Sequence, residues 1–390
     1  MPLTDDFVSP SSMRRQFCHD LDVYVCEDCA TVQTQHDVSA REYYEDYQYS
    51  VAGSATAGRF MHLLADSVTR KYGTVAPRER KILEIGSGDG SQLLVFKELG
   101  CQVLGYEPSS VLKRLAEDRG IPTIQGLFDR SFVPQLPDEF RQVDVVLLSY
   151  TLDHLPHPRE FLAAARTLLH PDRGILVVEV HDLEKIFQRQ ESCLFEHEHT
   201  IYLTAATAAS LAASEGLTVI DYDPVPVKER RANSLIFVSA PEGSELTRRF
   251  AAAPATVSED FADPDFLMRQ ADLLRRGIAN LDEFVNRVTA AGKTIAGYGA
   301  GGRGVMTMAA MQSAVKLRYV ADKRFGQVSL VAPKSGVRVV GLPTLKESPV
   351  DEILVFSFGY MKEIQADLAA FGYRPCQFHS LPDVVAGRSA

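Results

Sequence analysis

The sequence predicts an α/β protein built around a doubly wound sheet, with a small module before it and a second Rossmann-like α/β domain after it. Short apolar runs alternate with helical patterns between residues 61 and 240. A glycine-rich turn at residues 86–90 joins one such run to a helical pattern, and a similar opening recurs at residues 294–304. This alternation is typical of a sheet with a parallel core.

The individual elements follow from periodicity and run length. Strands are expected at 81–85, 102–106, 143–149, 174–180, 217–223 and 234–239, then at 294–298, 317–321, 337–340 and 352–356. Helices are expected at 58–72, 91–99, 109–119, 158–169 and 204–215, and from Phe266 to Val288. We therefore expect a cysteine-containing module at 1–60, a central domain at 61–240, a helical linker at 241–290 and a C-terminal domain at 291–390.

Composition narrows the partners. The chain has 390 residues, 45% of them apolar and 24% charged, which is ordinary for a globular protein. The formal net charge of -10 argues against nucleic acid or an anionic membrane as partner. No apolar run has the length of a spanning helix, and the first residues lack a signal pattern. We expect a cytoplasmic monomer or homodimer that acts on a small molecule.

The first glycine turn predicts an adenosine-containing ligand. Glycines at 86, 88 and 90 allow the backbone to approach a ligand closely, and Glu107 stands where an acid takes ribose hydroxyls. The spacing is not that of the dinucleotide fingerprint, and Glu84 and Asp89 would repel a pyrophosphate. S-adenosylmethionine carries an ammonium and a sulfonium, so acids around the loop favour it. A nicotinamide cofactor and a turn required only for packing remain the alternatives.

This arrangement resembles the first motif of class I methyltransferases. The resemblance implies S-adenosylmethionine as cofactor and S-adenosylhomocysteine as product. It places Gly126–Phe128 over the adenine and Ser149–Leu155 along the methionine end. The residues expected at the cofactor are Glu84, Gly86, Ser87, Gly88, Glu107, Pro108, Phe128, Ser149, Tyr150 and His154.

Three of the six cysteines lie near the N-terminus. Cys26 and Cys29 form a C-x-x-C pair, which can offer two thiolates to a tetrahedral zinc ion, and Cys18 is the natural third ligand. His19 or His36 is the candidate fourth ligand. A redox pair fits less well, because the motif does not open a helix after a strand. Unliganded cysteines in a degenerate module are the alternative.

The densest titratable patch is Glu196-His197-Glu198-His199. It follows the strand expected at 174–180, and loops beyond the carboxyl ends of strands are where doubly wound folds bind ligands. The two histidines lack the i, i+4 spacing of a helical zinc pair. Histidine titrates near neutral pH, so a general base oriented by a neighbouring carboxylate is the favoured interpretation. A solvated charged turn is the alternative.

Over nearly its whole length the chain resembles the sugar C-methyltransferases of deoxysugar biosynthesis, a route found in antibiotic-producing secondary metabolism. The similar segments are the C-x-x-C motif, the aromatic stretch 46–50, the element at 196–199 and the C-terminal signature at 297–304. The resemblance implies a zinc module, a central methyltransferase domain and a C-terminal Rossmann-like domain. It also implies a nucleotide-linked 4-keto-6-deoxysugar as substrate.

The chain departs from that family where substrate is expected. A first C-x-x-C is absent, the tyrosine opening the Tyr-His-Glu-His element is Glu196, and a strand that usually ends in Pro ends in His181. The stretch that is usually His-Gly-Gly-Ser reads Arg-Ala-Asn-Ser at 231–234. The cofactor half is retained and the substrate half is altered.

Carbon methylation requires an enolisable carbon next to a carbonyl, and the resemblance makes His199 the base. We expect Glu198 to orient it and the enolate oxygen to be bound by other polar side chains. The full catalytic set is His199, Glu198, Tyr49, Tyr47, His181 and Glu196, and the substrate set is Arg231, Asn233 and Arg303. Methylation of oxygen or nitrogen, a nicotinamide-dependent oxidoreductase and a non-enzymatic zinc protein are the competing functions.

Overall fold

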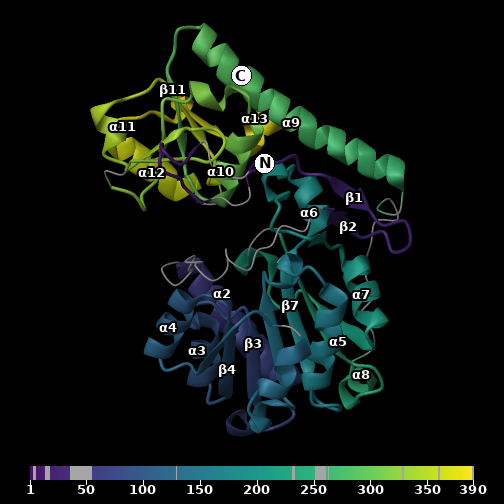
Figure 1. Cartoon of the computed structure of the whole chain (residues 1–390). Helices are drawn as coiled ribbons and strands as arrows, with labels where there is room; N and C mark the ends of the chain where they lie inside the picture. The colour runs from purple at the N-terminus through teal and green to yellow at the C-terminus, as the bar shows by residue number, and fades with distance from the viewer. Residues whose placement is uncertain are drawn as a thin grey trace. The chain divides into compact units, whose positions relative to one another are not determined.

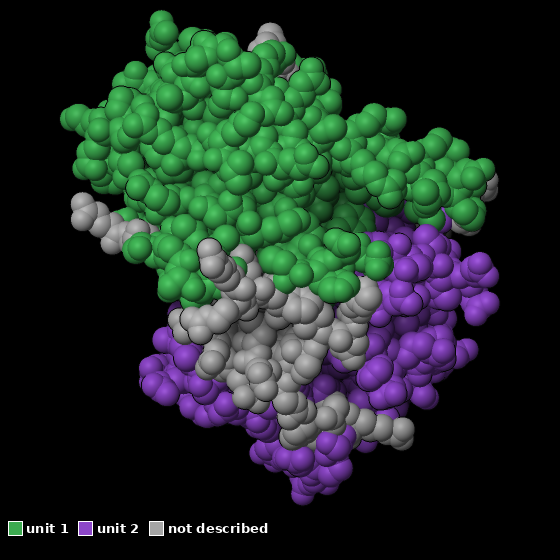
Figure 2. Space-filling model, turned by 45° about the horizontal axis from the view of Figure 1, so that its top comes forward, with its two compact units in different colours: residues 1–22, 186–198, 263–390 green, residues 23–185, 199–262 purple. Residues whose placement is uncertain are grey.

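The computed structural model describes residues 1–2, 6–13, 18–35, 55–128, 130–230, 233–250, 261, 263–326, 329–358 and 361–388. These residues form two compact units (Figure 2). The first unit contains residues 1–22, 186–198 and 263–390, and the second contains 23–185 and 199–262.

The second unit is built on a seven-stranded sheet in the order β5-β4-β3-β6-β7-β10-β9. Neighbours from β5 to β7 are parallel, whereas β10 is antiparallel to both β7 and β9. Because the first five strands are parallel, their carboxyl ends share one edge, where such sheets bind ligands. The strands are β3 (Lys81–Ile85), β4 (Gln102–Glu107), β5 (Thr123–Gln125), β6 (Val145–Ser149), β7 (Ile175–His181), β9 (Leu217–Tyr222) and β10 (Ser234–Pro241).

Helices cover both faces of this sheet (Figure 1). One hydrophobic cluster joins the sheet to α2, α3, α4 and α8, and another joins its opposite face to α5 and α7. The helices are α2 (Ala55–Tyr72), α3 (Ser91–Glu98), α4 (Ser110–Asp118), α5 (Pro158–Leu168), α7 (Ala205–Ser214) and α8 (Glu245–Arg249). The apolar side chains of alternate strand positions therefore fill two separate layers.

A small antiparallel sheet accompanies the second unit, in the order β1-β2-β8. Its strands are β1 (Val23–Val25), β2 (Val32–Thr34) and β8 (Ile201–Tyr202). The strand β8 begins two residues after His199, so this pairing fixes the chain that carries the histidine. The hydroxyl of Thr34 donates to the carbonyl oxygen of His199 at 3.0 Å.

The first unit holds a six-stranded sheet in the order β13-β14-β12-β11-β15-β16. Only β13 is antiparallel to its neighbour. One face packs on α9, α10 and α13, and the other on α11 and α12. The strands are β11 (Ile295–Tyr298), β12 (Val320–Ala321), β13 (Leu330–Val331), β14 (Arg338–Val340), β15 (Glu352–Val355) and β16 (Phe378–Ser380), and the helices are α9 (Pro264–Ala290), α10 (Gly302–Ala310), α11 (Thr344–Glu347), α12 (Met361–Ala370) and α13 (Leu381–Val385).

The predicted fold class is confirmed: both units are α/β, and the larger sheet is mixed with a parallel core. The sequence did not predict the short strands β1, β2, β5, β8, β13 and β16, or the helices α6 (Leu183–Gln188), α8, α11, α12 and α13. The helix predicted from Phe266 is α9, which packs against β11 and α13 within the first unit. No helix in the described part of the chain is both long enough and apolar enough to cross a membrane.

Candidate functional site

The turn after β3 is held by backbone hydrogen bonds, because the N–H groups of Gly86 and Ser87 both donate to the carbonyl oxygen of Tyr106. Gly86 and Gly88 adopt positive φ values of 71° and 54°, which glycine reaches without strain. A Cβ at Gly86 would lie 2.4 Å from Oγ1 of Thr151, whereas space within 4 Å of one at Gly88 is open. The N–H of Gly88 donates to Oε2 of Glu107 at 2.8 Å, and the N–H of Ser109 donates to Oε1 at 2.8 Å. The Glu107 carboxylate is thus fixed at the end of β4.

Glu84 lies directly before this turn. It is 3% exposed, and its Oε2 has no hydrogen-bond partner among the described residues. Burial, and next the charges of Glu107 and Asp89, hold the pKa of Glu84 well above its usual range. Burial likewise raises the pKa of Glu107, against the two backbone hydrogen bonds. A buried acid of this kind favours a cationic ligand beside it.

Asp89 has a structural role in the same turn. Its Oδ1 accepts from the N–H and the hydroxyl of Ser91 at 3.1 and 2.6 Å, and forms an ion pair with Arg119 at 3.0 Å. These contacts cap the first turn of α3. Glu84 and Glu107 are therefore the acids that remain for a ligand.

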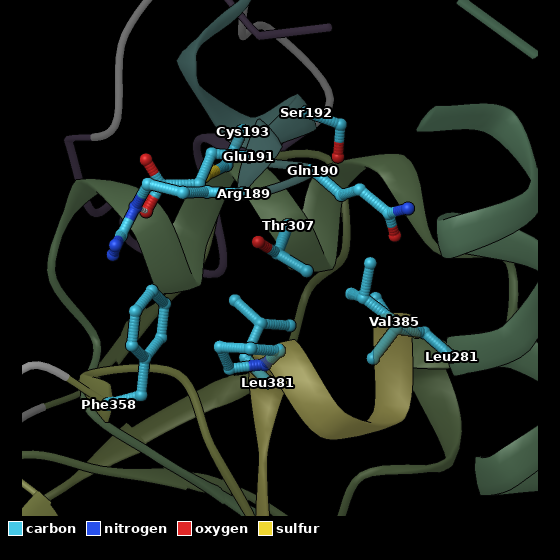
Figure 3. A pocket seen from close by; sticks show the side chains of 11 residues that line it. Arg189, Gln190, Glu191, Ser192, Cys193, Leu281, Thr307, Phe358, Leu381 and Val385 are labelled. Carbon is cyan, nitrogen blue, oxygen red and sulfur yellow. Dashed lines mark ion pairs between the residues drawn. The ribbon is translucent and has the colours of Figure 1, made fainter. Parts of the chain in front are cut away.

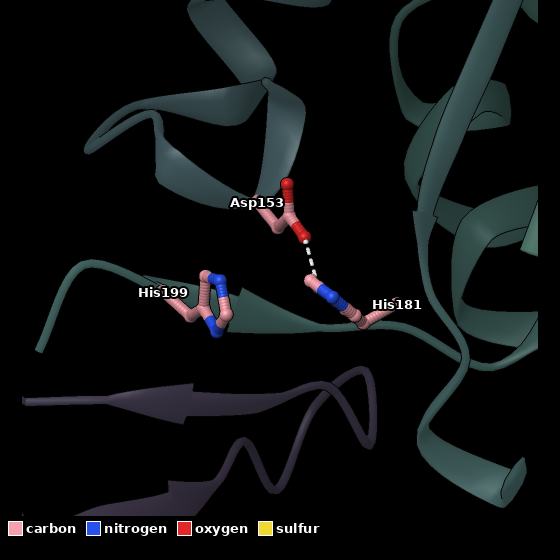
Figure 4. A group of neighbouring side chains, drawn as sticks. All are labelled: Asp153, His181 and His199. Carbon is pink, nitrogen blue, oxygen red and sulfur yellow. Dashed lines mark hydrogen bonds and ion pairs between the residues drawn. The ribbon is translucent and has the colours of Figure 1, made fainter. Parts of the chain in front are cut away.

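A buried carboxylate and two imidazoles meet beyond β6 and β7 (Figure 4). The side chains of Asp153, His181 and His199 point toward one another, and one ligand-type atom from each lies within 4.8 Å of the others. Nδ1 of His181 donates to Oδ2 of Asp153 at 3.0 Å. The rings of His181 and His199 have their centroids 4.9 Å apart. Asp153 comes from the short helical turn after β6, and His181 ends β7.

A third imidazole completes this group. The ring of His154 stands edge-on to that of His199, with the centroids 4.8 Å apart. Burial raises the pKa of Asp153, but the hydrogen bond from His181 and the charges of the three histidines outweigh it and hold that pKa well below its usual range. Burial lowers the pKa of His154. The group therefore combines one ionised acid with three imidazoles, which suits proton transfer near neutral pH.

Three family models match the chain. They are a “Methyltransferase domain” over residues 57–222, a “Putative zinc binding domain” over residues 1–44 and a “C-methyltransferase C-terminal domain” over residues 258–382. The chain is therefore an S-adenosylmethionine-dependent methyltransferase whose three parts match these models. The assignment replaces the alternatives of an oxidoreductase and a non-enzymatic zinc protein.

Two curated relatives show how far the similarity extends. The C-methyltransferase NovU from Streptomyces niveus is 26% identical over 348 residues, which are 88% of this chain and 81% of that protein. The ubiquinone biosynthesis O-methyltransferase from Aeromonas salmonicida is 26% identical over 174 residues, or 41% of this chain and 71% of that protein. The solved CcbJ methyltransferase from Streptomyces caelestis is 16% identical, with a TM-score of 0.37 over 52% of this chain and 96% of that chain.

The chemistry of the turn fits the cofactor of this methyltransferase. Its ammonium group would satisfy the orphaned oxygen of Glu84, and both oxygens of Glu107 keep lone pairs for ribose hydroxyls. Space beside Gly88 leaves room for close approach. These residues would hold S-adenosylmethionine, which supplies an electrophilic methyl group.

The other predicted cofactor residues are arranged as follows. Ser87 is buried with no partner for its hydroxyl, and Pro108 is half-buried directly after Glu107. Phe128 is buried, edge-on to Tyr106 at 5.4 Å and to Phe161 at 5.4 Å, so most of its ring belongs to the core. Ser149 and Tyr150 are half-buried, and the N–H of Tyr150 donates to the carbonyl of Glu179 at 2.8 Å.

The structure adds one residue to those predicted. The ring of His154, predicted at the cofactor, lies against that of His199 in the imidazole group. The carboxylate in the group is that of Asp153, for which the sequence predicted no role, and the orienting role of Glu198 stays a prediction. Asp153 follows a predicted strand and precedes a histidine, and this pattern could have indicated a functional carboxylate. Glu196 and Glu198 belong to the first unit, whereas His199 belongs to the second. The predicted residues Tyr47, Tyr49 and Arg231 lie outside the described residues.

The basic run before β10 is partly structural. Arg230 is buried, donates to the backbone carbonyl and the hydroxyl of Ser234, and forms an ion pair with Asp223 at 2.5 Å. Asn233 is buried beside it, and its carbonyl accepts from the N–H of Asp182 at 2.8 Å. Ser234 pairs with His181 across the strands, which brings Asn233 to the same end of the sheet as the imidazole group.

Two of the three cysteines predicted to bind zinc lie in one turn. Cys26 and Cys29 lie between β1 and β2, and Sγ of Cys29 is 3.3 Å from the hydroxyl of Thr31. Burial raises the pKa of Cys29, but hydrogen bonds with Thr31 and Cys26 outweigh it and hold that pKa below its usual value. Such a thiol favours metal binding. Cys18 belongs to the first unit, and zinc binding stays a prediction for these cysteines.

Proposed function

We propose that this methyltransferase forms a carbon–carbon bond at a carbon next to a carbonyl group. The observation that carries the proposal is the group of Asp153, His181 and His199 at the carboxyl ends of β6 and β7. Carbon methylation needs a base and a stabilised enolate, and this group supplies both. The C-methyltransferase model over residues 258–382 and the name of the relative NovU support the same reaction.

Each side chain has a distinct task in this proposal. His199 takes the α-proton of the substrate. In its doubly protonated form His181 donates its Nδ1–H to ionised Asp153, which directs Nε2 away from that acid, so that the Nε2–H can donate to the enolate oxygen. Asp153 acts through His181 and is a positioning residue. Bound S-adenosylmethionine would supply the methyl group to the enolate carbon and become S-adenosylhomocysteine, and His199 keeps the proton.

The substrate proposed is a nucleotide-linked keto-deoxysugar of secondary metabolism. It follows from the family resemblance at the sequence level and from the carbonyl that the mechanism requires. The ubiquinone biosynthesis O-methyltransferase matches only 41% of this chain. That similarity supports a shared cofactor domain and says nothing in favour of oxygen as the acceptor.

Deuterium exchange tests the mechanism independently of methyl transfer. With S-adenosylhomocysteine and a keto-sugar nucleotide in deuterated water, the wild-type enzyme should exchange the α-proton. His199→Ala should slow both exchange and methylation by about 10²–10⁴-fold. The matched control is His62→Ala, because His62 is exposed on α2. Methylation without exchange would instead indicate oxygen or nitrogen as the acceptor, and normal turnover by His199→Ala would remove His199 from the mechanism.

A further inference from the structure

Two arginines of the first unit share one aromatic ring. The guanidinium carbon of Arg303 lies 4.7 Å from the ring centroid of Phe358, and that of Arg189 lies 5.5 Å from it. In Figure 3 the side chain of Arg189 reaches toward this ring. Stacking of guanidinium groups on an aromatic face restricts their motion while leaving the nitrogen edges available.

Both guanidinium groups are anchored by the same buried acid. Nη2 of Arg303 donates to Oε1 of Glu191 at 3.0 Å, and Nε of Arg189 lies 3.3 Å from that oxygen. The Glu191 side chain is 1% exposed. One carboxylate cannot neutralise two guanidinium groups, so the cluster keeps one net positive charge. A carboxylate that contacts both guanidinium groups fixes their orientation, as carboxylates do for other ligand-binding side chains.

Most of the donors of this pair remain unused. Each guanidinium has five N–H groups. In the part of the chain that the structure describes, one of these ten donates a hydrogen bond to protein. The Arg189 and Arg303 side chains are 33% and 29% exposed, so their outer edges are accessible to a ligand.

The first turn of α10 adds further donors. Arg303 is its second residue, and its N-cap, Gly301, makes no side-chain cap. The first backbone bond of the helix runs from the N–H of Val305 to the carbonyl of Gly301. Backbone N–H groups at a helix start favour anions, and Arg303 belongs to this first turn.

The neighbouring cavity is too small to be the binding site itself. Arg189, Glu191, Thr307 and Phe358 help to line a space of about 10 Å³ (Figure 3). This volume suits about one water molecule. A water there would meet the need of Oε2 of Glu191, which has no partner. The ligand must therefore bind at the outer edges of the guanidinium groups.

We propose that Arg189 and Arg303 bind the phosphate oxygens of a diphosphate ester, held in position by Glu191 and Phe358. Planar guanidinium forks match phosphate oxygens in pairs, and two forks match two phosphate groups. The nucleotide-linked sugar of the proposed function would carry such a diphosphate. The proposal rests on that function only for the identity of the molecule that contains the diphosphate, and not for the site itself.

Calorimetry on the full-length protein tests the site. Thymidine diphosphate, pyrophosphate and inorganic phosphate are titrated into protein saturated with S-adenosylhomocysteine, which keeps nucleotide out of the cofactor site. We expect both diphosphates to bind more tightly than phosphate. Arg189→Ala and Arg303→Ala should each weaken diphosphate binding at least about tenfold. Arg275→Ala is the control, because Arg275 is an exposed arginine of the same unit paired with Asp272.

Conservative variants keep the test decisive if an alanine variant misfolds. Arg189→Lys and Arg303→Lys preserve charge but remove the fork, so each should weaken diphosphate binding more than phosphate binding. Equal affinities of wild type and all four variants would overturn the proposal, and so would the absence of diphosphate binding by wild type. Exchange and methylation are measured separately. An enzyme that exchanges the α-proton but binds no diphosphate would refute this site alone, and one that binds diphosphate without exchange would refute the proposed function alone.

Discussion

Glu84 is the residue whose charge is most sensitive to the cofactor. Its carboxyl group is fully enclosed and its pKa is raised, first by burial and then by Glu107 and Asp89. A bound ammonium group favours the ionised form, so cofactor binding should release a proton from Glu84. The affinity for S-adenosylmethionine should therefore rise with pH. The rise should end at about pH 7.7–8.0, where an α-amino group such as that of the cofactor loses its own proton.

Calorimetry in buffers of different ionisation enthalpy measures that proton. Glu84→Gln should abolish its release, flatten the pH dependence and weaken S-adenosylmethionine binding by about 10–100-fold, the size of a lost charge-assisted contact. Glu79→Gln is the control, since Glu79 is exposed on the same approach to β3. Release that persists in Glu84→Gln would assign the proton to another group.

The pKa of Asp153 is shifted in the opposite direction to that of Glu84. Its pKa is held low, so Asp153 stays ionised throughout the physiological range, and loss of activity on acidification reports protonation of imidazole. Asp153→Asn removes the charge that favours imidazolium, so the acid limb of kcat/KM should move toward lower pH. The rate should also fall by about 10²-fold, because His181 loses its anchor.

The pH profile separates this positioning role from mere damage to the fold. Asp66→Asn, on the exposed side of α2, is the control and should leave both rate and profile unchanged. A uniform fall in rate without a shifted acid limb would argue that Asp153 only supports the structure. The low pKa also implies stability: that contribution is present above the usual carboxyl range and is lost as acidification approaches the lowered pKa.

Among the elements, the connection between β3 and α3 is the most constrained. Gly86 has a positive φ, and a Cβ there would also meet Oγ1 of Thr151 at 2.4 Å. Gly86→Ala should destabilise the second unit by about 2–4 kcal/mol, the sum of backbone strain and a clash. Gly243→Ala shares the positive φ but has open space, so it should cost only about 1 kcal/mol. Chemical denaturation of both variants measures the difference.

Equal losses in the two variants would show that Thr151 moves aside freely. Cofactor binding gives a second measurement, because the turn at Gly86 lies between Glu84 and Glu107, the acids expected to hold the cofactor, whereas Gly243 follows β10. Gly86→Ala should therefore weaken S-adenosylmethionine binding, and Gly243→Ala should not.

Sequence reasoning succeeded where the signal was local. The run Lys81–Ile85, the glycine turn and Glu107 lie close together in the chain, and their periodicity was sufficient to predict β3, α3 and β4. The strand β8 has two residues, which are too few to show an alternating hydrophobic pattern, so its pairing with β2 could not be predicted. Asp153, His181 and His199 come from three separated segments, and only the packing of β6, β7 and β8 brings them together. The sequence therefore predicted a carboxylate next to His199 in the chain, Glu198, and did not predict Asp153.

At the scale of the whole molecule, the two units do not follow the order of the chain. Residues 186–198 belong to the first unit, although the chain on either side of them belongs to the second unit. The hydrophobic clusters nevertheless stay separate: two lie within the second unit and two within the first. Each unit thus has cores of its own, although the polypeptide passes between them several times.

Separate cores make a prediction about ligand-dependent stability. S-adenosylhomocysteine at a hundred times its dissociation constant should stabilise the unit that binds it by about 2.7 kcal/mol. Hydrogen exchange should therefore slow by up to about a hundredfold in β3 and β4, while exchange in β11 and β15 should not change. Glu84→Gln should remove the effect at the same ligand concentration. Equal protection of both sheets would mean that the two units open together, and the separate clusters would then not define independent cooperative units.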